Sequence, residues 1–182
     1  MKTLWAPWRM SYILGQAGTR QGCIFDFPAA ITHDKRQLLL YKDELCEVLL
    51  NRFPYANGHL LIAPARHVAD ITGLSNTEAN ALMAILKESI IILRRHLRPD
   101  GFNSGLNLGA AAGAGQADHL HFHVVPRWQE DHNFMTVTAE IRSIPEHIDN
   151  TFDQLLPDFQ ALARQGTENR RQRTEDRGHK KE

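Results

Sequence analysis

The sequence predicts an α+β fold in which one long helix packs with a mostly antiparallel sheet of five strands. Three strand-like segments precede a single long segment with helical spacing, and two more strand-like segments follow it. The chain has 182 residues, which suits one domain with a sizeable core.

The first three strands are expected at residues 37–42, 46–51 and 59–64. Each is a short run of mainly apolar residues, and turn residues separate the runs. Residues 52–58, which contain Pro54, Asn57 and Gly58, join the second run to the third.

The long helix is expected over residues 75–97. Ser75 and Glu78 have the spacing of a capping box, with Ser75 as the N-cap. The residues at helical spacing are Leu82, Ile85, Leu86, Ser89 and Leu93. Arginines near the end of the segment suit the negative end of the helix dipole, and a Pro-Asp-Gly run at residues 99–101 ends it.

The last two strands are expected at residues 102–108 and 119–128, on either side of a glycine-rich loop over residues 109–116. A C-terminal helix is expected around residues 145–165, and Pro157 is expected to kink or break it. A five-stranded sheet has two edges that need cover.

The C-terminal segment differs in composition from the rest of the chain. Residues 167–182 contain no hydrophobic residue and carry six basic and four acidic side chains. Such a segment cannot bury enough apolar area to offset the entropy lost on ordering. We therefore expect one domain over residues 1–165 and a charged, disordered tail over residues 166–182. Its interleaved charges and lack of aromatic residues argue against a nucleic-acid-binding arm.

Charge and cysteine content limit the class of protein. Twenty-one basic residues balance twenty-one acidic residues, so nothing favours general binding to nucleic acids or anionic membranes. Cys23 and Cys46 form no disulfide framework and suit a reducing compartment. No apolar run approaches the roughly 20 residues that cross a bilayer. We expect a cytoplasmic protein with neither a nucleic-acid nor a membrane partner.

The strongest chemical signal is the alternation of His119, His121 and His123 with apolar residues. In a strand, alternate side chains point to opposite faces, so the three histidines would share one face. Neighbouring histidines would be about 6.7 Å apart and the outer two about 13 Å apart. Two neighbours could share a zinc ion, whereas three would struggle to reach the same ion. The spacing favours a row of imidazoles along an extended ligand over a chelate or a chance run of exposed histidines.

The glycine-rich loop leads directly into this segment. Its small residues would let backbone N–H groups approach an anion, and Asn107 and Gln116 supply amide donors at its two ends. Alone, such a loop is more often a simple connection. Beside a row of histidines, it suggests a polyphosphate held against an imidazole.

These residues resemble the signature of a known family. The run from His119 to Val125 is similar to the His-φ-His-φ-His-φ-φ motif of the histidine triad (HIT) superfamily of nucleotide hydrolases and transferases, where φ is apolar. The similarity covers about residues 4–165. The segments that resemble the branch containing diadenosine tetraphosphate phosphorylases are residues 4–13, 51–55, 58–60, 98–103 and 126–128.

The resemblance implies a role for each site residue. His121 would attack the α-phosphate of the substrate and form a nucleotidyl-histidine intermediate. His123 would contact the phosphate oxygens and the leaving group, while His119 and His59 would orient the row. Asn51 would contact the ribose. The implied phosphate-binding region comprises Asn107, Gly113, Gly115 and Gln116, although Gln116 lies three residues before the first histidine, where many relatives have a glutamine four before it.

Some relatives also hold a structural zinc ion with a Cys-x-x-Cys motif and two later histidines. Here the second cysteine is replaced by Asp26. Asp26 could still bind zinc with Cys23, His67 and His119, because carboxylates are zinc ligands. The favoured interpretation is that Cys23 is a small buried apolar residue, and no metal or cofactor is assigned.

The expected activity is nucleotidyl transfer from a dinucleoside polyphosphate, foremost phosphorolysis of diadenosine tetraphosphate to ATP and ADP. One alternative is hydrolysis of nucleoside polyphosphates or phosphoramidates. Others are a nucleotide-binding sensor without significant turnover and a zinc-dependent enzyme that uses His119 and His121. The family resemblance implies a homodimer whose two sheets join edge to edge.

Overall fold

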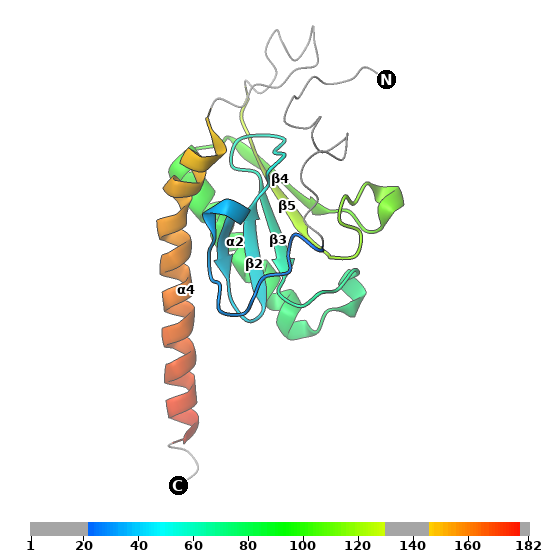
Figure 1. Ribbon diagram of the computed structural model, residues 1–182. Helices are drawn as coiled ribbons and strands as arrows, with labels where there is room; N and C mark the ends of the chain where they lie inside the picture. Colours follow the sequence, from blue (N-terminus) through cyan, green and yellow to red (C-terminus); the bar gives the residue numbers. More distant parts are fainter. Residues whose placement is uncertain (1–21, 130–145, 179–182) are drawn as a thin grey trace, which may run out of the picture.

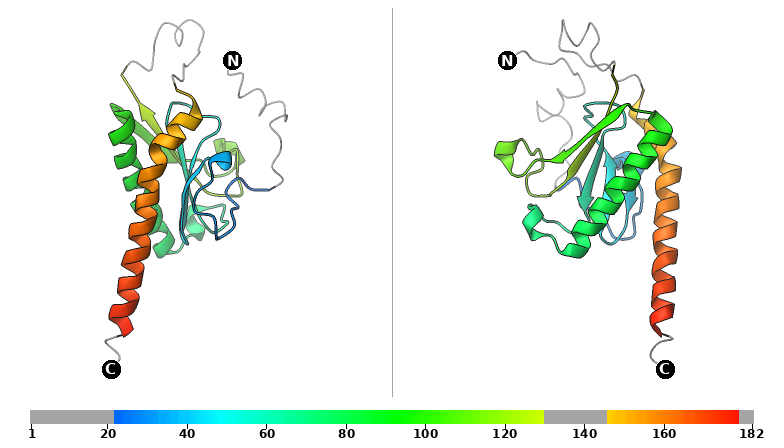
Figure 2. Two further views of the ribbon diagram at one scale, coloured as in Figure 1. Left: turned by 60° about the vertical axis from the view of Figure 1, so that its left-hand side comes forward. Right: turned by 180° about the vertical axis from the view of Figure 1, so that it is seen from behind.

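The computed structural model describes residues 22–129 and 146–178. Within them, five strands form one antiparallel sheet, and two α-helices pack on one face of it (Figures 1 and 2). The strand order is β1-β2-β3-β5-β4. The strands are β1 (Leu39–Lys42), β2 (Cys46–Leu50), β3 (Leu60–Pro64), β4 (Gly101–Leu106) and β5 (Phe122–Arg127). The α+β prediction is confirmed, with every strand pair antiparallel.

Strand β3 lies at the centre of the sheet and is buried on both faces. Leu60 and Ile62 contribute to the core beneath the helices, while Leu61 and Ala63 belong to a second apolar cluster. Because strand side chains alternate, this second cluster lies on the opposite face. Residues before β1, including Phe25, complete it. The sheet therefore has one face covered by helices and one face covered by the segment that precedes β1.

Helix α2 (Asn76–Leu97) follows the prediction closely. Ser75 accepts the backbone N–H of Glu78, and the Glu78 carboxylate accepts the N–H of Ser75, so the capping box is confirmed. Arg66 also binds both Glu78 oxygens, at 2.7 and 3.1 Å. The helix ends where Arg98 adopts a left-handed conformation with φ of 47°.

Helix α4 (Ile148–Gly178) is longer than predicted, and Pro157 does not break it. Pro157 removes one backbone hydrogen bond. Around it, Phe152, Leu155 and Phe159 are almost fully buried against the sheet and α2. Their burial compensates for the lost hydrogen bond, which explains why the expected break is wrong. The helix continues past residue 165, and the disordered tail over residues 166–182 stays a prediction.

The histidine-containing strand is shorter than predicted. Strand β5 begins at Phe122, so His119 and His121 precede it and only His123 lies within it. Leu120 lies before the strand, and its backbone N–H donates to the carbonyl of Val68 at 2.7 Å. The first strand is likewise shorter, because Asp34 caps the 3-10 turn Lys35–Gln37 that precedes it.

Among the described residues, no helix has both the length and the apolar character that a membrane-crossing helix needs.

Candidate functional site

Four histidines gather on the sheet face opposite the helices. His59 precedes β3, His119 and His121 precede β5, and His123 lies in β5 next to Leu61 of β3. The ring of His123 is 5.1 Å from that of His59 and 5.0 Å from that of His121. His119 stands apart from this row and contacts the Phe25 ring at 5.0 Å, which in turn contacts His121 at 5.2 Å. The rings of His59, His123 and His121 therefore form a row of neighbouring imidazoles on this face of the sheet.

The tautomer of His121 follows from its backbone partner. Its Nδ1 lies 2.9 Å from the carbonyl oxygen of His119. A carbonyl only accepts, so Nδ1 carries a proton, and in the neutral ring the lone pair is on Nε2. His121 therefore offers an unprotonated nitrogen for nucleophilic attack.

The tautomer of His123 is set through His59. The backbone N–H of Tyr55 and the side-chain amide of Asn51 both lie 3.2 Å from His59 Nδ1, which must therefore accept. His59 Nε2–H then donates to Nδ1 of His123 at 2.9 Å. His123 is left with its proton on Nε2, so it offers a hydrogen-bond donor beside the free nitrogen of His121.

Burial keeps this pair of rings neutral. Loss of solvent, together with the neighbouring imidazoles of His123 and His121, lowers the pKa of His59 to about 3. The same burial, with the nearby His121, lowers the pKa of His123 to about 4. At neutral pH both rings are uncharged and keep the tautomers described above.

Asn51 has a structural role that its sequence position did not indicate. Its amide nitrogen faces His59, and its Oδ1 accepts the backbone N–H of Phe53 at 3.0 Å. Both ends of the amide are engaged, so Asn51 orients His59. The ribose contact implied by the family resemblance stays a prediction.

The other predicted binding residues lie in the loop before His119. Asn107 donates to the carbonyl of Gly113 at 3.5 Å, and Gln116 donates to Asp118 at 2.5 Å. Gly113, with φ of 89°, occupies a left-handed position that favours glycine, and Gly115 is exposed. The hydrogen bonds of both amide side chains stay within residues 107–118, and phosphate binding stays a prediction.

Two aromatic residues were missed by sequence reasoning. Tyr55 packs its ring 4.8 Å from that of His59 and stacks on His123 at 6.1 Å, while Phe25 contacts His119 and His121. Tyr55 lies in a segment that carries the family resemblance, but spacing alone does not place it on the histidines. Phe25 approaches them only because the segment before β1 covers this sheet face.

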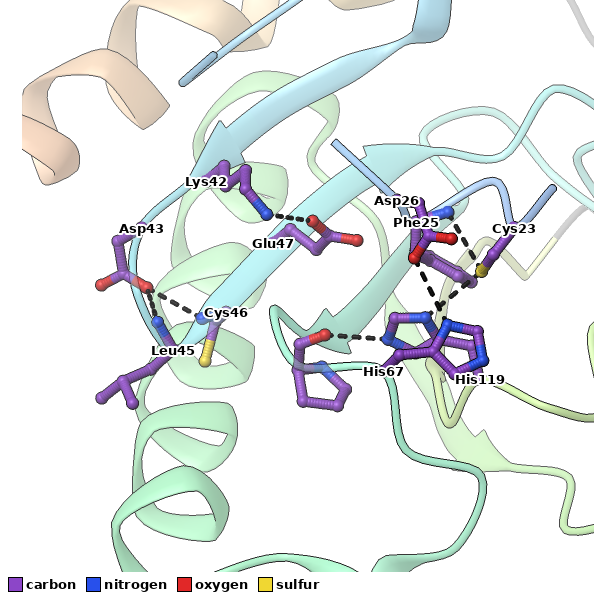
Figure 3. Close-up of polar contacts among 11 residues, drawn as sticks. Cys23, Phe25, Asp26, Lys42, Asp43, Leu45, Cys46, Glu47, His67 and His119 are labelled. Atoms are coloured by element: carbon purple, nitrogen blue, oxygen red, sulfur yellow. Dashed lines mark hydrogen bonds and ion pairs between the residues drawn. The ribbon is translucent and has the colours of Figure 1, made fainter. Parts of the chain in front are cut away.

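A second cluster adjoins the row and could hold a metal ion (Figure 3). One ligand atom from each of Cys23, Asp26, His67 and His119 can be chosen so that all lie within 4.8 Å of one another. His119 Nε2–H donates to the carbonyl of Pro64 at 2.9 Å, so its Nδ1 accepts from the Cys23 thiol, 3.2 Å away, and its lone pair faces the cluster. One thiol, one carboxylate and two imidazoles fit zinc or a similar divalent ion.

Without a metal ion, Cys23 behaves as the buried residue that the sequence favours. It is 4% exposed, and burial raises the pKa of its thiol to about 11. A bound divalent ion would supply the positive charge that stabilises the thiolate. Burial and metal binding are therefore compatible at this position.

The sequence and the fold are similar to those of known proteins. The HIT domain matches residues 32–130. An AP-4-A phosphorylase from Mycobacterium tuberculosis is 36% identical over 157 residues, 83% of this chain and 80% of that protein. A bis(5'-adenosyl)-triphosphatase from Dictyostelium discoideum is 28% identical over 51% of this chain and 62% of that protein. The crystal structure of a zinc-bound histidine triad family protein from Mycobacterium smegmatis has a TM-score of 0.56 and 27% identity, covering 76% of this chain and 88% of that one.

Proposed function

Because the chain belongs to the HIT domain family, we propose that it is a nucleotide enzyme that transfers a nucleotidyl group through His121. The observation that carries the proposal is the pair of tautomers. His121 offers an unprotonated Nε2, and the adjacent His123 offers an Nε2–H. Displacement at a phosphoryl group needs such a nucleophile together with a prepositioned donor.

In the first step, the Nε2 lone pair of His121 attacks the α-phosphorus of a dinucleoside polyphosphate. The bond from that phosphorus to its bridging oxygen breaks, and the electron pair leaves with the polyphosphate. His123 donates a hydrogen bond to the phosphoryl or departing oxygen. Polyphosphate is a stable anion at neutral pH, so a neutral donor suffices and no proton need be transferred.

In the second step, an oxygen of inorganic phosphate attacks the phosphorus bound to His121. The phosphorus–nitrogen bond breaks, and its electron pair returns to Nε2. With diadenosine tetraphosphate as the substrate, the leaving group is ATP and the second product is ADP. Similarity to an AP-4-A phosphorylase over most of the chain supports this substrate and phosphate as the second nucleophile.

A hydrolase is the second candidate. The chain also resembles a bis(5'-adenosyl)-triphosphatase, although over only 51% of its length. With water in place of phosphate, the same His121 intermediate would release AMP. The lower identity and coverage place hydrolysis behind phosphorolysis.

The loop before β5 is proposed to bind the polyphosphate through Asn107, Gln116 and the backbone at Gly113 and Gly115. A metal ion held by Cys23, Asp26, His67 and His119 would fix these side chains next to the row. None of the steps above uses that ion. The reacting atoms are those of His121, the substrate and phosphate.

We also propose a homodimer formed through the open edge of the sheet. β1 and β4 are the edge strands, and α4 packs beside β1. Asn103, Ser104 and Gly105 of β4 are exposed. An exposed edge strand offers unpaired backbone groups to a second copy. Light scattering of the full chain tests this proposal, and a monomer at micromolar concentration would contradict it.

Product analysis with diadenosine tetraphosphate tests the activity. ATP and ADP formed only when phosphate is present would support the phosphorylase, and AMP and ATP formed without phosphate would support the hydrolase. His121→Ala should bind nucleotide but lose turnover by orders of magnitude and form no covalent adduct. Adduct formation by this variant would overturn the role of His121. Binding without turnover by the unmodified chain would favour a nucleotide sensor.

A further inference from the structure

Residues 51–58 form the loop that fixes the tautomer of His59. The Asn51 amide and the Tyr55 backbone N–H both face Nδ1 of His59 at 3.2 Å. The backbone N–H of Asn51 also donates to the carbonyl of His59 at 2.8 Å, which closes the loop at its base. Because His59 in turn donates to His123, the shape of this loop decides whether His123 keeps its proton on Nε2. Whatever anchors the loop therefore also orients His123.

Asn57 anchors the end of this loop to helix α4. Its amide nitrogen donates to Glu146 Oε2 at 3.2 Å, and its Oδ1 lies 2.9 Å from the hydroxyl oxygen of Thr151. A carboxylate only accepts, so Glu146 fixes which end of the Asn57 amide faces it. The Thr151 hydroxyl also lies 2.8 Å from the same Glu146 oxygen, and its one proton serves both acceptors. The three side chains form a closed polar cluster between the loop and the first turn of α4.

The next residue, Gly58, packs against the end of α2. Its φ of 72° is in the left-handed region, and a Cβ at this position would overlap Cδ1 of Leu97 and lie 3.2 Å from Leu93. Apolar packing is not directional, so this contact fixes how closely the loop approaches the helix. The hydrogen bonds of Asn57 are directional, and they therefore set the direction in which the loop presents its donors to His59.

The hydroxyl of Thr151 lies in an otherwise apolar environment. Thr151 is fully buried, and its neighbours Phe152 and Leu155 belong to the core between α4 and the sheet. A buried hydroxyl has lost its hydrogen bonds to water and must recover them from the protein. Threonine inside a helix commonly bonds to a carbonyl of its own helix, whereas Thr151 bonds to Asn57, 94 positions away in the sequence. Valine would fill almost the same space, so what the hydroxyl adds is the connection to the loop.

We propose that Thr151, acting through Asn57, is a positioning residue of the histidine row. Its hydroxyl holds the loop so that both donors keep facing His59, and His59 then keeps the proton of His123 on Nε2. The effect on the reaction rests on the proposed function, whereas the effect on the tautomers does not. His123 would donate to oxygens whose charge develops in the transition state. Loss of the Thr151 hydroxyl should therefore lower kcat and leave KM almost unchanged.

The first experiment compares Thr151→Val with Thr151→Ser. Valine keeps the shape and removes the hydroxyl, whereas serine keeps the hydroxyl and removes a methyl group. With diadenosine tetraphosphate, kcat should fall between about 10-fold and about 100-fold in Thr151→Val, while Thr151→Ser should keep most of it. Ser89→Ala is the matched control, because Ser89 is a fully buried residue of α2 whose hydroxyl has no hydrogen-bond partner among the described residues. Equal losses of kcat in the valine and serine variants would contradict the proposal.

The second experiment uses nitrogen NMR of the histidine rings without substrate. In the unmodified chain, His59 and His123 should both carry the proton on Nε2. Thr151→Val should give mixed tautomers or broadened signals for both rings, whereas Thr151→Ser and Ser89→Ala should not. Unchanged ring signals in folded Thr151→Val would overturn the proposal.

Asn57→Ala tests the same connection from the loop side. Asn57 is only half-buried, so this variant should fold even if Thr151→Val does not. It should produce the same NMR change, and combining it with Thr151→Val should add little, because both substitutions break one connection. Unchanged ring signals in Asn57→Ala would also overturn the proposal. A chain whose tautomers respond in this way but which forms no adduct with diadenosine tetraphosphate would reject the proposed function and leave the effect of Thr151 on the tautomers intact.

Discussion

Replacing Asn51 with aspartate should raise the pKa of His59 into the mildly acidic range. In the structure the Asn51 amide lies 3.2 Å from Nδ1 of His59, and burial lowers the pKa of that histidine to about 3. Asn51→Asp places a carboxylate where the amide stood. A carboxylate favours the charged imidazolium, so the pKa of His59 should rise.

The size of this effect follows from the distance. Two unit charges 3.2 Å apart interact by about 5 kcal/mol at an effective dielectric constant of about 20. One pH unit corresponds to about 1.4 kcal/mol, so full expression of this energy would raise the pKa of His59 to about 7. Asn51 is only half-buried, and solvent should screen about half of the interaction. The expected pKa therefore lies between about 5 and about 7.

Histidine NMR signals followed over a pH titration measure this change. In the unmodified chain His59 should stay neutral down to the acid limit of folding, whereas in Asn51→Asp it should titrate in the mildly acidic range. His59 would still donate from Nε2 to His123, so the variant should keep turnover with an altered pH profile. Asn103→Asp is the control, because Asn103 accepts from Arg127 instead of facing a histidine. If His59 in Asn51→Asp titrates as in the unmodified chain, the geometry described for this pair is refuted.

Three further predictions concern stability. The folded pKa values of His59 and His123 are lowered to about 3 and about 4, so the unfolded chain binds more protons once the pH falls below about 6.5. The stability that these two histidines contribute should therefore be present above about pH 6.5 and be lost progressively between about pH 6.5 and about pH 3. Urea unfolding at several pH values checks this, and a midpoint constant over that range would contradict it. Phe159→Ala should cost about 3–5 kcal/mol of unfolding free energy, because Phe159 is fully buried. Ile91→Ala, at a residue 38% exposed, should cost much less, and equal losses would disprove the assigned packing. Deleting residues 167–182 should leave both melting temperature and turnover almost unchanged, and a large loss of either would show that this segment supports the fold.

Local patterns in the chain were sufficient to predict most of the fold. Apolar runs of strand length, the capping box of Ser75 and Glu78, and the helical spacing that follows act over a few residues, so they can be read without tertiary contacts. The family signature at His119–Val125 likewise identified the HIT family, which the comparisons confirm. Pro157 shows the limit of such local rules, because the packing of Phe152, Leu155 and Phe159 overrides the helix break that the proline favours.

The sequence by itself determined the sheet, the long helix, the family and the expectation that His119, His121 and His123 share one face. Only the tertiary structure decided how those histidines differ. His119 turns toward Cys23 because Leu120 bonds to Val68 in place of a neighbouring strand. A tautomer depends on which donor or acceptor faces each nitrogen. His121 bonds back to the nearby carbonyl of His119, whereas the partner of His123 is His59, from a segment far away in the chain. Neither residue type nor spacing records these partners, so which ring nitrogens carry a proton is decided only when the chain folds.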